Sequence, residues 1–148
     1  MRFAFASVFS LVLFVSGCGE VTGEPIEMSK LCVQENDGKY FQVSGVLSPR
    51  SSVYCSNRGG RMECGMDLLE SAGSQTKISA DIEVGSGANT MDEVPKGFKK
   101  EDLKVRDKGG NPIALGRDTA KFTGKMLIAP GAAGNPGTCL MQVHKIEK

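Results

Sequence analysis

Residues 39–48 read KYFQVSGVLS, and this stretch decides the predicted fold. Phe41, Val43 and Leu47 recur at every second position or a multiple of it, and this period is typical of a half-buried β-strand. Gly45 interrupts the run, which indicates a bulge or the close approach of a second backbone. We therefore predict a long strand that is bent or crowded at its centre.

Four more segments are predicted to be strands. The clearest is TKISADIEV (76–84), because Ile78, Ala80, Ile82 and Val84 share one face. Glycine also interrupts the fourth strand of the chain, at Gly124. The other predicted strands are RMECGMDLLE (61–70), with Met62, Cys64, Met66 and Leu68 on its buried face, TAKFTGKMLI (119–128) and CLMQVHKIE (139–147).

Short helical segments accompany the strands. Residues 26–33 are predicted to form one or two helical turns, and residues 97–105 a short helix anchored by Phe98 and Leu103. The sequence RDKGGNP (106–112) is predicted to be a tight turn. The predicted fold class is therefore all-β, or β-rich α+β, with five principal strands.

Two glycine-centred motifs give this layout a resemblance to a known fold. Val43-Ser44-Gly45-Val46-Leu47 and Phe122-Thr123-Gly124-Lys125-Met126 lie in the first and fourth predicted strands. This arrangement resembles the OB-fold, a small five-stranded Greek-key barrel, over roughly residues 38–147. The resemblance implies that the first strand is kinked at its glycine and serves both halves of the sheet. A small β-sandwich is the alternative architecture.

The N-terminus has the layout of an export signal. Arg2 provides a positive charge, and Phe3 to Val15 form an apolar run of thirteen residues broken only by two serines. A membrane-spanning helix needs about 20 apolar residues, so this run is too short to span a bilayer. Residues 1–17 are therefore predicted to be a signal peptide.

The end of that segment resembles a known processing site. Val15-Ser16-Gly17-Cys18 is similar to the lipobox of bacterial lipoproteins. The resemblance implies that Cys18 becomes the lipidated first residue, that the barrel is held at the cell envelope, and that residue 19, a glycine and not an aspartate, directs it to the periplasmic face of the outer membrane in a Gram-negative cell. Two acyl chains on one residue give stable anchoring. Residues 18–25 would then be a tether and residues 26–148 one domain. An ordinary secreted protein is the alternative.

Composition excludes some classes of partner. Removal of residues 1–17 from the 148-residue chain leaves 131 residues with equal numbers of basic and acidic side chains, 17 of each. This balance predicts no nucleic-acid partner. Tryptophan is absent and few aromatic residues remain, which disfavours ligand classes that bind by stacking.

Four cysteines remain once Cys18 is assigned to lipid. In an exported chain an even number favours disulfides, and four cysteines allow three pairings. The sequence CSNRGGRMEC contains a Gly-Gly turn and predicts a hairpin closed by Cys55–Cys64, which leaves Cys32 to pair with Cys139. A zinc site is the alternative, but it needs ligands more closely spaced than these.

Catalytic motifs are scarce. His144 is the only histidine, and strand alternation places it in step with Leu140 and Ile146, as a partly buried or rim residue. The chain has no C-x-x-C, phosphate-binding loop or zinc-protease motif. We therefore predict no enzymatic activity, no cofactor and no resident metal.

The loop after the first strand carries the most suggestive surface residues. They are Arg50, Tyr54, Arg58 and Arg61, and arginine forks bind phosphate or carboxylate well. The leading functional hypothesis is a non-enzymatic interaction module that is anchored to the membrane through lipid on Cys18 and binds another envelope protein. The alternative is a binder of an anionic small ligand or a glycan through these four residues.

Overall fold

The computed structural model describes residues 19–134 and 137–148, and the predicted fold class is confirmed. The predicted signal peptide and Cys18 lie outside the described residues. Within these ranges no helix is long and apolar enough to cross a membrane. The five long strands match the five predicted segments: β2 (Tyr40–Ser48), β4 (Arg61–Leu69), β5 (Lys77–Glu83), β8 (Thr119–Ala129) and β9 (Thr138–Glu147).

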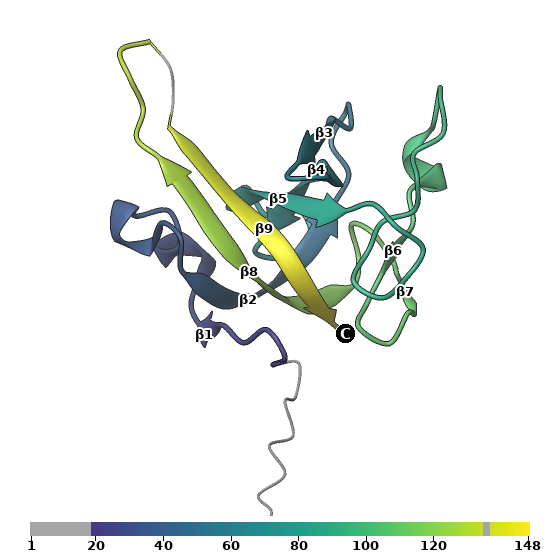
Figure 1. Ribbon diagram of the computed structural model, residues 1–148, viewed down its shortest axis with the longest axis horizontal. Coiled ribbons are helices and arrows are strands. Elements are labelled where there is room, and N and C mark those ends of the chain that lie inside the picture. Colours follow the sequence, from purple (N-terminus) through teal and green to yellow (C-terminus); the bar gives the residue numbers. More distant parts are fainter. Residues whose placement is uncertain (1–18, 135–136) are drawn as a thin grey trace, which may run out of the picture.

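The long strands close into a ring. β2 pairs with β4, β4 with β5, β5 with β9, β9 with β8, and β8 again with β2. Only the β5–β9 pair of this ring is parallel. A sheet whose first and last strands pair is a barrel, and the β8–β9 hairpin crosses the front of it in Figure 1. Its interior is filled by apolar side chains that include Phe41, Val43, Leu47, Met66, Leu68, Ile82, Phe122, Met126 and Met141.

The predicted crowding at Gly45 is where the barrel closes. β2 pairs with β8 from Tyr40 to Val46, and from Val46 onward it also pairs with β4. A Cβ atom at Gly45 would lie 2.5 Å from the carbonyl oxygen of Leu69, a distance that real Cβ atoms do not adopt. Only glycine lets β2 pass this close to the end of β4.

A β-bulge changes the predicted faces of the last strand. Thr123 pairs with Lys145 and Gly124 with Val143, so His144 is the additional residue on β9. A Cβ atom at Gly124 would lie 2.3 Å from the carbonyl oxygen of Gln142. The prediction that His144 is partly buried is confirmed, but the prediction that Leu140, His144 and Ile146 share one face is wrong, because the bulge shifts Ile146 to the other face.

Residues between β5 and β8 cover one end of the barrel. Met91, Leu103, Val105 and Ile113 are buried against the core. The helix predicted at 97–105 is wrong in extent: a single 3₁₀ turn, η3 (Lys100–Asp102), is followed by a β-ribbon. Pairing of its C-terminal residue Val105 with Ile113 and Met91 overrides local helix propensity here. The ribbon consists of β6 (Val105–Arg106) and β7 (Pro112–Ile113), and the predicted turn connects them.

The N-terminal segment contacts the barrel from a residue nearer the start of the chain than its composition predicts. β1 (Glu24–Pro25) pairs in parallel with β2, and Glu20 forms an ion pair of 2.6 Å with Lys145 of β9. The segment expected to be a tether thus lies against the barrel from Glu20 onward, close to the end where the C-terminus lies (Figure 1). Two 3₁₀ turns follow: η1 (Met28–Lys30), within residues 26–33 where helical turns were expected, and η2 (Gln34–Asn36), just beyond them.

Both predicted cysteine pairs form disulfides. Cys55 lies directly opposite Cys64 in the hairpin of β3 (Cys55–Arg58) and β4. Cys32 bonds to Cys139 across a sequence separation of 107 residues and links the segment after η1 to β9. Met62, predicted on the buried face, is exposed because it lies beyond Glu63, the last residue of β4 that pairs with β5.

Candidate functional site

The four predicted site residues lie over one surface of the barrel. Strand alternation directs the odd-numbered residues of β4 and β5 away from the interior, and we call this surface the outer face. The loop from β2 to β3 brings Arg50 and Tyr54 to it, and the β3–β4 hairpin brings Arg58 and Arg61. The outer face comprises Glu63, Gly65 and Asp67 of β4 and Lys77, Ser79, Asp81 and Glu83 of β5.

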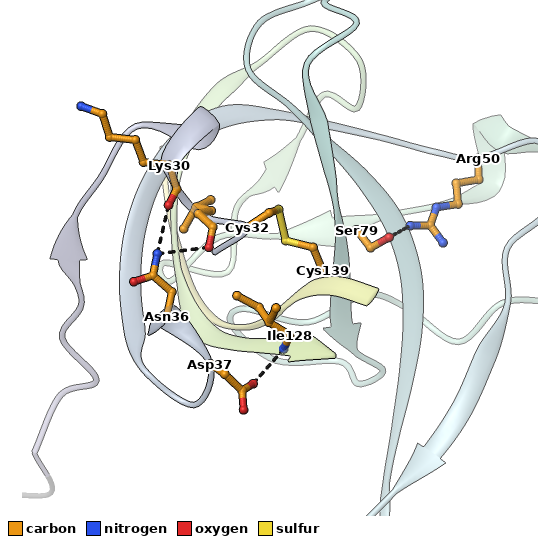
Figure 2. The surroundings of a disulfide bond; sticks show 9 residues. Lys30, Cys32, Asn36, Asp37, Arg50, Ser79, Ile128 and Cys139 are labelled. Atoms are coloured by element: carbon orange, nitrogen blue, oxygen red, sulfur yellow. Dashed lines mark hydrogen bonds between the residues drawn. A yellow bond between two sulfur atoms is a disulfide. The ribbon is translucent and has the colours of Figure 1, made fainter. Parts of the chain in front are cut away.

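Arg50 is held firmly at one end of the outer face. Its Nε donates to Asp67 Oδ1 at 2.7 Å, and its Nη2 donates to Ser79 Oγ at 2.6 Å and to the Met66 carbonyl at 3.1 Å. Lys77 Nζ donates to the other oxygen of Asp67 at 2.7 Å. Figure 2 shows Arg50 and Ser79 in the surroundings of the Cys32–Cys139 disulfide. Three hydrogen bonds from Nε and Nη2 thus hold Arg50 against the protein, which indicates a structural role.

Arg58 is held far more loosely. Its Nη2 lies 3.5 Å from Asp81 Oδ2 and its Nε lies 3.8 Å from Glu63 Oε2. These are ion-pair distances, longer than ordinary hydrogen bonds. The Arg58 side chain is 48% exposed. Arg61 has a similar contact of 3.5 Å with Glu83.

Two carboxylates lie under Arg58. Glu63 is only 4% exposed; its Oε1 accepts from Gln142 Nε2, while its Oε2 is buried without a hydrogen-bond partner. Asp81 is 9% exposed. Burial raises the pKa of Asp81 and the nearby Glu63 charge adds to this change, whereas the charges of Arg58 and Arg50 oppose it. The pair is thus two nearly buried acids beneath one half-exposed cation.

A small recess opens beside this pair. Its volume is about 180 Å³, and Arg50, Tyr54, Arg58, Gly65, Ser79, Asp81, Thr138 and Leu140 are among its lining residues. Gly65 keeps it open, because a Cβ atom there would lie 3.4 Å from Asp81 Oδ1 and 3.2 Å from Arg50 Nη1. Tyr54, at the rim, is 76% exposed. The recess therefore has one carboxylate, Asp81, in a wall that also contains Arg50 and Arg58.

A larger depression continues from the recess past the disulfide. It has a volume of about 440 Å³ and is lined by Asp67, Lys77, Ser79 and Thr138 together with Cys32 and Cys139. Ser79 and Thr138 also line the recess, so the two hollows adjoin. Figure 2 shows the disulfide between the segment after η1 and β9, with Asp37 accepting from the Ile128 amide nearby.

His144 lies at the opposite margin of this surface. Its ring centroid is 5.5 Å from that of Tyr40, and its Nε2 is buried without a hydrogen-bond partner. Burial, followed by the charge of Arg61, lowers the pKa of His144. The charges of Glu63 and Glu83 act on the pKa of this ring in the opposite direction.

The structure brings all four predicted residues to one face, but it pairs the three arginines among them with carboxylates of the chain itself. Arg50, Arg58, Arg61 and Lys77 each contact a carboxylate of the chain, and the carboxylates are Glu63, Asp67, Asp81 and Glu83. No three metal-ligating side chains gather within residues 19–134 and 137–148. The sequence reasoning missed the acids, although their odd positions in two strands with apolar even positions already indicate an acidic face.

The chain matches no protein-family model and none of the curated proteins searched.

Proposed function

We propose that the protein is a lipid-anchored envelope lipoprotein whose barrel is a non-enzymatic module that binds another envelope protein through its outer face. The observation that carries this proposal is the outer face itself, where charged side chains of both signs surround a recess over partly buried acids. Mixed charges of this kind give an interface specificity and steer association.

The N-terminus supports the anchoring part of the proposal. The apolar run and Val15-Ser16-Gly17-Cys18 resemble a lipoprotein signal, and the two disulfides fit an oxidising compartment. Only Gly19 separates Cys18 from Glu20, which bonds to the barrel. Two residues span at most about 7 Å, so the barrel would lie directly on the membrane surface.

The strand order supports the resemblance to the OB-fold. A first strand shared between two neighbours and a parallel pair formed by β5 and β9 agree with a closed Greek-key barrel of five strands. Such barrels bind partners on the surface of their second and third strands, which correspond here to β4 and β5. We propose this architecture as the scaffold of the outer face.

Binding of an anion or a glycan is the second candidate. Tyr54 is exposed beside the recess and could contact a sugar ring, and this observation keeps the hypothesis open to test. The arginines argue against it, because their charges are already balanced by four carboxylates. An incoming anion would have to displace these carboxylates or bind against their repulsion.

Anchoring is tested by Cys18→Ala. We expect metabolic labelling with a palmitate analogue to be lost and the protein to leave the membrane fraction or remain unprocessed. Cys18→Ser, which also lacks the thiol, should behave in the same way. Normal processing and membrane attachment in both variants would refute the lipoprotein assignment.

Partner binding is tested by crosslinking in intact cells. A photoreactive residue replaces Tyr54 at the recess, and a control protein carries it at Lys99, which is exposed on the η3 segment. We expect one membrane or periplasmic protein to be crosslinked from position 54 and not from position 99. Adducts that contain only glycan or small molecules would favour the second candidate.

A further inference from the structure

The charges of the outer face specify the kind of group that fits the recess. We infer that the recess binds a lysine ammonium of the partner protein, and that Arg58 occupies this acidic site in the free protein and is displaced when the partner binds. The inference rests on the proposed function, because it takes the ligand to be a side chain of a protein.

Asp81 is the group that a cationic ligand would stabilise. It is nine-tenths buried, it lines the recess, and no side-chain hydrogen bond reaches it among the described residues. A carboxylate removed from water without hydrogen bonds is unfavourable, and a cation that donates to it relieves this cost. The neighbouring Glu63, with one buried oxygen unbonded, adds negative charge, while Arg50, which also lines the recess, is paired with Asp67.

Arg58 does not satisfy this site. Its contacts of 3.5 and 3.8 Å are too long for the short, charge-assisted bonds that a guanidinium forms with a carboxylate when the two meet directly. About half of its side chain is exposed, and ion pairs of this kind contribute little free energy. Arg58 can therefore swing into water at small cost.

The size and lining of the recess favour lysine. A volume of about 180 Å³ is below the range of about 300–1,000 Å³ that is usual for small-molecule sites, but it accommodates an ammonium and its last methylenes. An ammonium donates three hydrogen bonds, and Asp81, Ser79 and Thr138 line the recess with oxygen acceptors. Leu140 and the Tyr54 ring can cover the methylenes and face the charge.

An anionic ligand leads to the opposite expectation for Arg58. If Arg58 attracts the ligand, its removal must weaken binding. If Arg58 competes with the ligand for Asp81, its removal must strengthen binding. Arg61, on the same hairpin, pairs with Glu83 and does not line the recess, so Arg61→Ala is a matched control.

The test is an NMR titration of the mature protein with N-acetyl-lysine amide, monitored at the amides of Gly65 and Asp81. We expect saturable shifts that the uncharged N-acetyl-norleucine amide does not produce. Affinity should rise about two- to fivefold in Arg58→Ala, remain unchanged in Arg61→Ala, and fall about tenfold or more in Asp81→Asn. Thermal unfolding verifies that each variant is folded.

Weaker binding in Arg58→Ala, or saturation by N-acetyl-aspartate and not by the lysine probe, would overturn the inference. Absence of any saturable shift with the lysine probe would also overturn it.

Crosslinking from position 54 separates this inference from the proposed function. Loss of the partner adduct in Asp81→Asn supports both. A partner adduct that persists in Asp81→Asn overturns the lysine site and leaves the proposed function standing. If no protein is crosslinked in the parent, the proposed function fails.

Discussion

The two ends of the outer face contain the same kinds of groups in different states. At one end Arg50 donates a short hydrogen bond to Asp67, and the neighbouring Cys32–Cys139 disulfide closes a loop that contains most of the chain. At the other end Arg58 lies at a long ion-pair distance from Asp81, and the Cys55–Cys64 disulfide closes a single hairpin. Satisfied charges stabilise a fold, whereas unsatisfied buried charges are a reason to expect a ligand.

The two disulfides should differ in what they contribute to stability. In the chain-entropy account, the loop of 107 residues is worth about 5 kcal/mol and the loop of 9 residues about 3 kcal/mol. We expect Cys32→Ser/Cys139→Ser to lower the free energy of unfolding by more than Cys55→Ser/Cys64→Ser, as measured by urea denaturation. Equal losses in the two double variants would remove this difference between the ends.

The two arginines provide the next comparison. Arg50→Ala removes three hydrogen bonds and leaves Asp67 with Lys77 alone, so we expect a loss of about 1–3 kcal/mol. Arg58→Ala removes only long, half-exposed ion pairs and should cost less than about 1 kcal/mol. Arg50→Lys, which keeps the charge but not the planar fork, should fall near Arg50→Ala. A larger loss in Arg58→Ala than in Arg50→Ala would contradict the assignment of Arg50 as structural.

The last comparison is between the two aspartates, Asp67 and Asp81, and its expected effect on stability is the smallest. Burial opposes ionisation of Asp67, but hydrogen bonds from Lys77 and Arg50 outweigh it and lower its pKa. The pKa of Asp81 is raised instead, chiefly by burial. Asp67 thus stabilises the fold above its unfolded pKa of about 3.9 and loses this contribution as the pH falls. Ionised Asp81 disfavours the fold at neutral pH, and this cost disappears as the pH falls through its raised pKa.

We therefore expect opposite results from the two amide variants at pH 7. Asp67→Asn should lower the free energy of unfolding, whereas Asp81→Asn should raise it by about 0.5–1 kcal/mol, a gain of the size seen when a functional site is relieved of unfavourable groups. Urea denaturation at pH 7 and near pH 3.5 provides the measurement. The difference between each variant and the parent should shrink at the lower pH, and a destabilised Asp81→Asn at pH 7 would count against the proposed site.

Sequence by itself located the five long strands, most clearly where apolar residues recur with the period of two of a half-buried strand, as in β5. It also indicated the two glycines that a crowded barrel needs, Gly45 and Gly124. The hairpin disulfide followed from a short segment with a Gly-Gly turn. All of these features depend on neighbours within a strand or a turn.

Only the tertiary structure decided how those residues are used. The bulge at His144 arises from the pairing of β8 with β9, and β1 forms only because β2 offers it a partner. Arg50 lies in the loop before β3 and Arg58 at the end of β3, yet the first is fixed by Asp67 and Ser79 while the second lies at long ion-pair distance from Asp81. Ser79 and Asp81 are successive outward-facing residues on β5, and strand pairing determines which arginine each one contacts. The strength of such contacts depends on distance and burial, and both are determined by residues that are distant in the sequence.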